Sequence, residues 1–99
     1  MNINVSSIHF TADQKLVDFA EKKIGKLDTF FDGIISAEVI LKVVKPETAN
    51  NKLTEIRLSI SGNDLFAKKQ ADTFEEAIDL SIDALKKQLS KFKEKLREK

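Results

Sequence analysis

The residues of this 99-residue sequence best suited to chemistry are the lysines near its C-terminal end. Residues 84–99 hold seven Lys or Arg and two Glu, a net charge of +5, whereas the whole chain carries only +1. Residues 1–83 are therefore acidic, with a net charge of −4. Ammonium groups attract phosphates as point charges and do not read a base sequence. This asymmetry predicts a polyanionic partner.

The basic residues at this end recur at helical spacing, in one row along a flank of the expected helix and another across its back. They are Lys86, Lys93 and Arg97 in the first row, and Lys87, Lys91 and Lys95 in the second. Cations near a helix C-terminus also complement the helix dipole, but that effect fades within a turn and these rows run over several turns. A phosphate-binding surface is the favoured interpretation, and a solubilising, dipole-complementing face is the alternative.

A second group of lysines falls on the first expected helix. Lys22 and Lys26 share one stripe, whereas Lys23 projects into the apolar arc. Two explanations of Lys23 stay open: its methylenes pack at the edge of the core, or its ammonium points along the seam between two helices. If the two helices lie side by side, their basic C-terminal parts form one continuous positive patch.

Catalytic and metal-binding constellations have little support. His9 is the only histidine, and the chain has no cysteine to partner it. Glu75, Glu76 and Asp79 are better explained as carboxylates that complement a helix N-terminus than as metal ligands. Neither a phosphate-binding glycine loop nor a dinucleotide fingerprint is present. We expect a protein that is not an enzyme and that uses no metal, cofactor or small-molecule substrate.

Hydrophobic periodicity indicates the elements that must position these lysines. Each helix is expected to follow a capping-box threonine, Thr11 for the first and Thr73 for the second. The elements are strands over residues 2–8, 34–44, 55–60 and 65–71, and helices over residues 12–28 and 74–96.

The strand over 34–44 alternates most clearly and should turn one apolar face inward, formed by Ile35, Ala37, Val39, Leu41 and Val43. The last helix carries an apolar stripe from Phe74 to Leu96. The order predicts an α+β fold, a two-layer β-α-β-β-β-α sandwich whose four-stranded sheet has both helices packed on one face. The other face would be polar, with Phe66 as the one aromatic residue to watch for base stacking.

No apolar run approaches the ~18 residues of a membrane span, and the first residues lack a signal-peptide pattern. We expect one domain over residues 1–99, in the cytoplasm and without a membrane partner. We find no internal repeat or linker.

Several stretches carry a specific likeness, most clearly in the last helix. They are residues 23–27, 31–32, 39–43, 77–79 and 85–96. On these residues the chain resembles the ribosome hibernation promoting factor / ribosome-associated inhibitor family of subunit-interface proteins, in its short form, over essentially its whole length.

The resemblance implies a ribosome-binding domain that blocks translation. Its partner would be the small ribosomal subunit (16S rRNA and nearby ribosomal proteins), at the decoding region, in the channel used by mRNA and tRNA, and the protein would be a monomer off the ribosome. The family's contacts come from basic residues of both helices. They map here onto Lys22, Lys23, Lys26, Lys86, Lys87, Lys91, Lys93 and Lys95.

Two departures from the family pattern concern what the protein does on the ribosome. Phe92 stands where many relatives have a histidine, and the long form's dimerisation domain and the inhibitor subgroup's tail are absent. Whether it promotes ribosome dimers or holds inactive monomers stays open. Two other classes also stay open: a general double-stranded-RNA binder, and a protein-interaction module that uses the long last helix.

Overall fold

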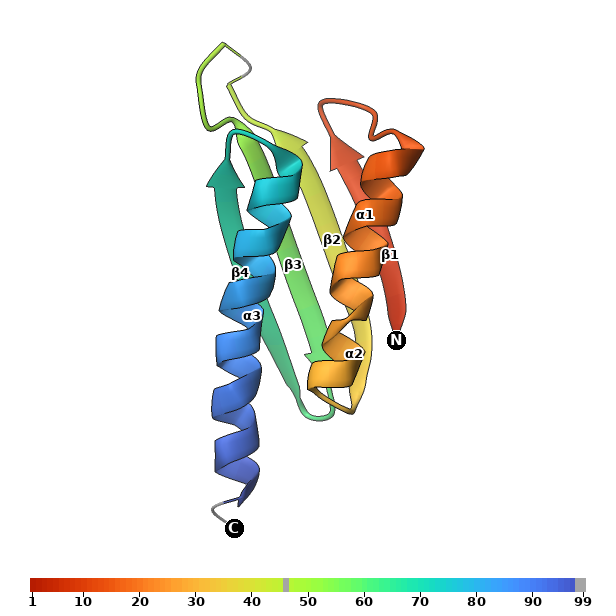
Figure 1. Cartoon of the computed structure of the whole chain (residues 1–99), viewed down its shortest axis with the longest axis vertical. Coiled ribbons are helices and arrows are strands. Elements are labelled where there is room, and N and C mark those ends of the chain that lie inside the picture. Colours follow the sequence, from red (N-terminus) through yellow and green to blue (C-terminus); the bar gives the residue numbers. More distant parts are fainter. Residues whose placement is uncertain (46, 98–99) are drawn as a thin grey trace.

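The computed structural model describes residues 1–45 and 47–97, with the side chains of Leu96 and Arg97 outside the described residues. Seven elements follow one another along the chain (Figure 1). They are β1 (Asn2–Ile8), α1 (Gln14–Gly25), α2 (Leu27–Phe30), β2 (Ile34–Val43), β3 (Lys52–Ile60), β4 (Asn63–Ala71) and α3 (Phe74–Arg97).

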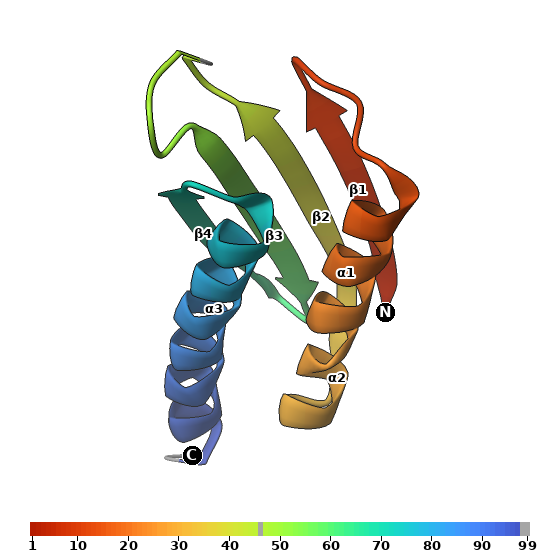
Figure 2. The same ribbon diagram turned by 45° about the horizontal axis from the view of Figure 1, so that its top comes forward.

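The four strands form one sheet in the order β1-β2-β3-β4. β1 and β2 are parallel, because α1 and α2 carry the chain back to the end of the sheet at which β1 begins. β2 with β3 and β3 with β4 are antiparallel pairs. All helices lie on one face of the sheet and leave the other face uncovered by helices (Figure 2). The predicted α+β two-layer sandwich is confirmed.

The core fills the space between the helices and the sheet. Its most deeply buried large side chains come from the helices and from the two central strands. They are Ile24 of α1, Leu27 of α2, Val39 and Leu41 of β2, Ile56 and Leu58 of β3, and Ile78, Leu85 and Leu89 of α3. Each fully buried aliphatic side chain contributes roughly 1.5–3 kcal/mol, and this burial holds α1 and α3 as rigid supports.

The first helix begins later and ends earlier than the sequence predicts. Asp13, not Thr11, is the N-cap, and its Oδ1 accepts a hydrogen bond of 2.9 Å from the Leu16 amide. An ionised carboxylate is a stronger acceptor than a hydroxyl and also interacts with the positive end of the helix dipole. The helix ends at Gly25, and the single-turn α2 follows as a separate element.

The apolar face of β2 also differs from the expectation at its first residue. A bulge between Ile34 and Ser36 shifts the register against β3. Ile34 is consequently buried, whereas Ile35 is 58% exposed. The extra residue of a bulge interrupts strict alternation. The prediction that Ile35 faces the core is therefore wrong, whereas Ala37, Val39 and Leu41 are confirmed in the core.

α3 follows its prediction closely. The Glu76 amide donates to Thr73 Oγ1 at 3.1 Å, which confirms Thr73 as the cap. The apolar stripe is buried from Phe74 to Leu89, and Phe92 continues it by packing edge-on against Phe31, with ring centroids 5.6 Å apart. The expected end of the stripe at Leu96 lies outside the described side chains. In the described part of the chain, no helix is both long and apolar enough to span a membrane.

Candidate nucleic-acid interface

α1 and α3 lie side by side and run in the same direction, so their basic C-terminal parts reach the same end of the molecule (Figure 1). α3 continues beyond the sheet at that end. The sequence anticipated the lysines on each helix, but the parallel arrangement is what brings the two groups to one end.

A groove between these helices is lined by three of the predicted lysines and by two carboxylates that the sequence analysis did not place beside them. Lys23, Lys26 and Lys86 line it together with Asp79 and Asp83. We call it the inter-helix groove. Its formal charge is +1, so it attracts phosphate less strongly than the lysines alone would.

Lys23 satisfies both explanations that the sequence left open. Its ammonium lies 5.4 Å from the centre of the Phe19 ring, at the edge of the core, and 3.4 Å from Asp79 Oδ1 across the seam. Both partners of this ion pair are partly exposed, and such pairs contribute about 0–1 kcal/mol. A phosphate can therefore compete with Asp79 for this ammonium.

Lys93 is engaged within the protein. Its ammonium donates to the carbonyl oxygen of Phe30, at the end of α2, and lies 4.6 Å from the centre of that residue's ring. The side chain is half-buried. Lys93 thus ties the C-terminal part of α3 to α2, and this contact within the protein is its role in the structure.

The remaining predicted lysines of α3 project in three directions. Gln88 contacts the main chain of Phe66 on β4, which marks the flank of α3 that faces away from α1. Residues three and seven positions further along a helix share a flank, so Lys91 and Lys95 project on this side, while Lys86 faces the inter-helix groove and Lys87 projects outward. The expected single patch is therefore a curved surface around α3.

Six of the eight predicted residues present exposed side chains. They are Lys22, Lys26, Lys86, Lys87, Lys91 and Lys95. Arg97, which the sequence analysis placed in the first row, lies outside the described side chains.

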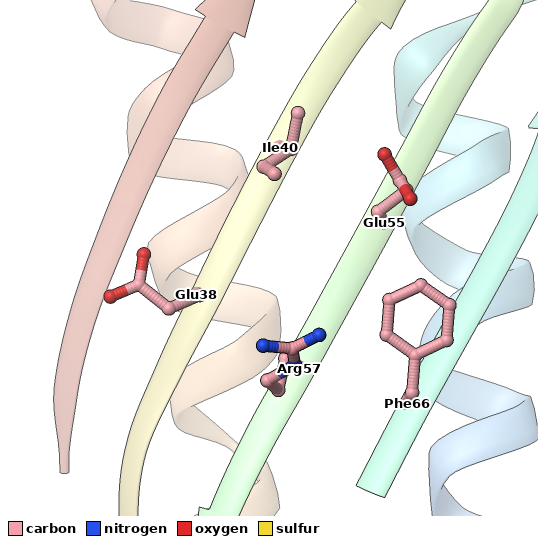
Figure 3. A pocket seen from close by; sticks show the side chains of 5 residues that line it. All are labelled: Glu38, Ile40, Glu55, Arg57 and Phe66. Atoms are coloured by element: carbon pink, nitrogen blue, oxygen red, sulfur yellow. The ribbon is translucent and has the colours of Figure 1, made fainter.

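A second feature, which the sequence alone did not reveal, lies on the open face of the sheet. It is a shallow depression lined by Glu38, Ile40, Glu55, Arg57 and Phe66 (Figure 3). Phe66 was singled out from its exposed position in β4, whereas its neighbours are recognisable only from the pairing of strands. Cross-strand register was the missing signal, because it places Arg57 directly opposite both Glu38 and Phe66.

Comparison with known proteins gives a consistent result over nearly the whole chain. A family model described as "Sigma 54 modulation protein / S30EA ribosomal protein" matches residues 3–97. A ribosome hibernation promoting factor of Azotobacter vinelandii is 37% identical over 95 residues, which cover 96% of this chain and 85% of the relative. The protein of that name in Escherichia coli K12 is 31% identical and covers 99% of both chains.

Solved structures agree on the fold. The N-terminal domain of Protein Y from Thermus thermophilus superposes with a TM-score of 0.80 at 26% identity, covering 93% of this chain and 99% of the other. A ribosomal subunit interface protein from Coxiella burnetii superposes with a TM-score of 0.84 at 24% identity, covering 94% of this chain and 98% of the other. The second likeness supports the fold alone.

Proposed function

Because the chain belongs to the Sigma 54 modulation protein / S30EA ribosomal protein family, we propose that it is a ribosome-binding hibernation factor that inhibits translation. It acts without catalysis, by occupying the mRNA and tRNA channel of the small subunit near the decoding site. Its partners are 16S rRNA and the ribosomal proteins beside it, so it works in the cytoplasm.

The observation that carries this proposal is the meeting of basic helix ends. α1 and α3 run in parallel, so their C-terminal parts reach the same end of the molecule. Both helices carry exposed lysines, and their inner faces are buried. Structured RNA is recognised largely through its backbone and shape, and ammonium groups on rigid helices suit that mode. A rigid basic wedge blocks the channel sterically.

The relatives support the same assignment through their names. The proteins of Azotobacter vinelandii and Escherichia coli that match this chain are both called ribosome hibernation promoting factor. They match over 85% and 99% of their own length, so the likeness covers nearly all of each relative.

The two other classes are less well supported. A double-stranded-RNA binder needs cations at the start of its last helix, but Glu75 and Glu76 stand exposed there. A helix-based protein-interaction module would leave the apolar stripe uncovered beyond Leu89, but Phe92 packs against Phe31.

Cosedimentation with purified ribosomes tests the proposal. The protein should sediment with 30S and 70S particles at modest salt, and its binding should weaken as salt rises because bound phosphates release counterions. Lys87→Glu/Lys91→Glu should abolish sedimentation without unfolding the chain, since both side chains are exposed.

A matched control reverses two lysines at the other end of the molecule. Lys45→Glu/Lys69→Glu makes the same change in net charge on two exposed residues near the C-terminal ends of β2 and β4. This variant should still cosediment. Equal loss of binding in both double variants would assign the effect to net charge and remove the two-helix surface from the proposal.

A further inference from the structure

The open face of the sheet carries a small, ordered group of side chains that ribosome binding through the helices does not use. Glu38, Arg57 and Phe66 stand in one row across β2, β3 and β4. Glu55 lies two residues earlier in β3, where it is opposite Ile40 on β2 and the exposed Lys68 on β4. Figure 3 shows the Arg57 guanidinium between Glu38 and the Phe66 ring, with Glu55 beside that ring.

The ring and the guanidinium form a platform. Arg57 Cζ lies 6.0 Å from the centre of the Phe66 ring, and Phe66 is 45% exposed. Gln88 fixes the Phe66 main chain from behind with two hydrogen bonds. Exposed aromatic rings and arginine guanidinium groups are both surfaces on which unpaired bases stack.

The carboxylates beside the platform have capacity left to accept hydrogen bonds. Glu38 is directly opposite Arg57 in the register, yet within residues 1–45 and 47–97 no ion pair joins them, and Glu38 Oε1 instead accepts a 3.3 Å bond from Asn4. An ionised carboxylate offers acceptors alone.

We propose that this depression binds an unpaired guanine base of RNA, which stacks on Phe66 while its N1–H and N2–H donate to the Glu55 carboxylate. Guanine is the base whose Watson–Crick edge presents two adjacent donors to a carboxylate. Adenine, cytosine and uracil each present only one donor group on that edge, with an acceptor beside it. Arg57 already places a cation in the depression, which favours a neutral base over an arginine of a protein partner.

This site faces away from the helix lysines, so it supplies the base-specific contact that those lysines do not make. The proposed guanine site does not depend on the proposed ribosome binding. The test uses the full chain and short RNA alone, and its failure would leave cosedimentation unaffected.

Amide NMR spectra of the ¹⁵N-labelled protein, titrated with hexanucleotides, provide the test. A uridine hexamer with one central guanosine should shift the amides of Glu55, Arg57 and Phe66 and bind roughly tenfold more tightly than the all-uridine hexamer. Replacing the guanosine by inosine, which lacks the N2 amino group, should remove most of that preference.

Protein variants locate the contact. Phe66→Ser should abolish the shifts, and Glu55→Gln should remove the preference for guanosine over inosine. Ile35→Ser, which removes another exposed apolar side chain, should bind like the parent, and the Lys87→Glu/Lys91→Glu variant should retain the guanosine preference.

Three results would overturn the proposal. They are shifts confined to the helix lysines, equal binding of both hexamers, and unchanged guanosine preference in folded Phe66→Ser. Tighter binding of a short arginine-rich peptide than of the guanosine hexamer at these same amides would assign the depression to a protein partner instead.

Discussion

The side chain of Gln88 closes two hydrogen bonds on the main chain of Phe66. Its Nε2 donates to the Phe66 carbonyl oxygen at 2.8 Å, and its Oε1 accepts from the Phe66 amide at 3.4 Å. Phe66 lies on β4, an edge strand whose outer main-chain groups pair with no other strand in the described part of the chain. An amide side chain of α3 thus takes the place of that partner and joins the helix to the sheet edge.

Gln88→Ala should destabilise the protein by about 1–3 kcal/mol, because two hydrogen bonds of about 0.5–1.5 kcal/mol each are lost. Urea unfolding followed by circular dichroism measures this change. The exposed neighbour Lys87→Ala should change stability by less than about 0.5 kcal/mol. Equal stability of Gln88→Ala and the parent would show that water replaces the clamp at no cost.

Lys93→Met should lower the free energy of unfolding by about 1–3 kcal/mol. The ammonium donates to the Phe30 carbonyl and lies over the Phe30 ring, and hydrogen bonds of charged groups contribute about 1.5–3 kcal/mol. The exposed Lys95→Met makes the same chemical change without these contacts and should be nearly neutral. Chemical denaturation measures the free energy of unfolding of both variants. Equal values would show that Lys93 serves only as a surface cation.

Asp79→Asn should increase affinity for ribosomes by a few-fold, because it frees the Lys23 ammonium and removes one negative charge from the inter-helix groove. Stability should change little, since exposed ion pairs contribute about 0–1 kcal/mol. Quantitative cosedimentation measures the affinity. Glu21→Gln removes an exposed carboxylate of α1 that does not line the groove, and a similar gain there would assign the effect to net charge.

Ile34→Ala and Ile35→Ala should differ sharply although the residues are adjacent. Ile34 is 6% exposed and Ile35 is 58% exposed, so truncating Ile34 should cost about 2–5 kcal/mol by loss of buried contacts and truncating Ile35 about 0.5 kcal/mol or less. Thermal unfolding of the two variants tests the bulge. A larger loss of stability for Ile35→Ala than for Ile34→Ala would contradict the bulge and indicate strict alternation in β2.

Local patterns predicted the order and type of the main elements. They failed where two nearby residues were equally suited to one role. Thr11 and Asp13 both precede the first helix, and periodicity does not say which side chain caps it. Ile34 and Ile35 are equally apolar, and only the pairing with β3 selects the buried one.

The candidate interface was predictable in its residues but not in its electrostatics. Spacing identified the lysines of both helices. It did not reveal that Asp79 pairs with Lys23 or that Lys93 is held by Phe30, because these partners are 56 and 63 residues apart in the sequence.

The sequence by itself determined the α+β class, the basic C-terminal helix and the family likeness, since each depends on residues close together in the chain. Only the tertiary structure decided which lysines stay free and which face of the sheet carries the Arg57 and Phe66 platform. Both depend on side chains that meet across helices and strands, where packing and register choose among partners that the order of residues leaves equivalent.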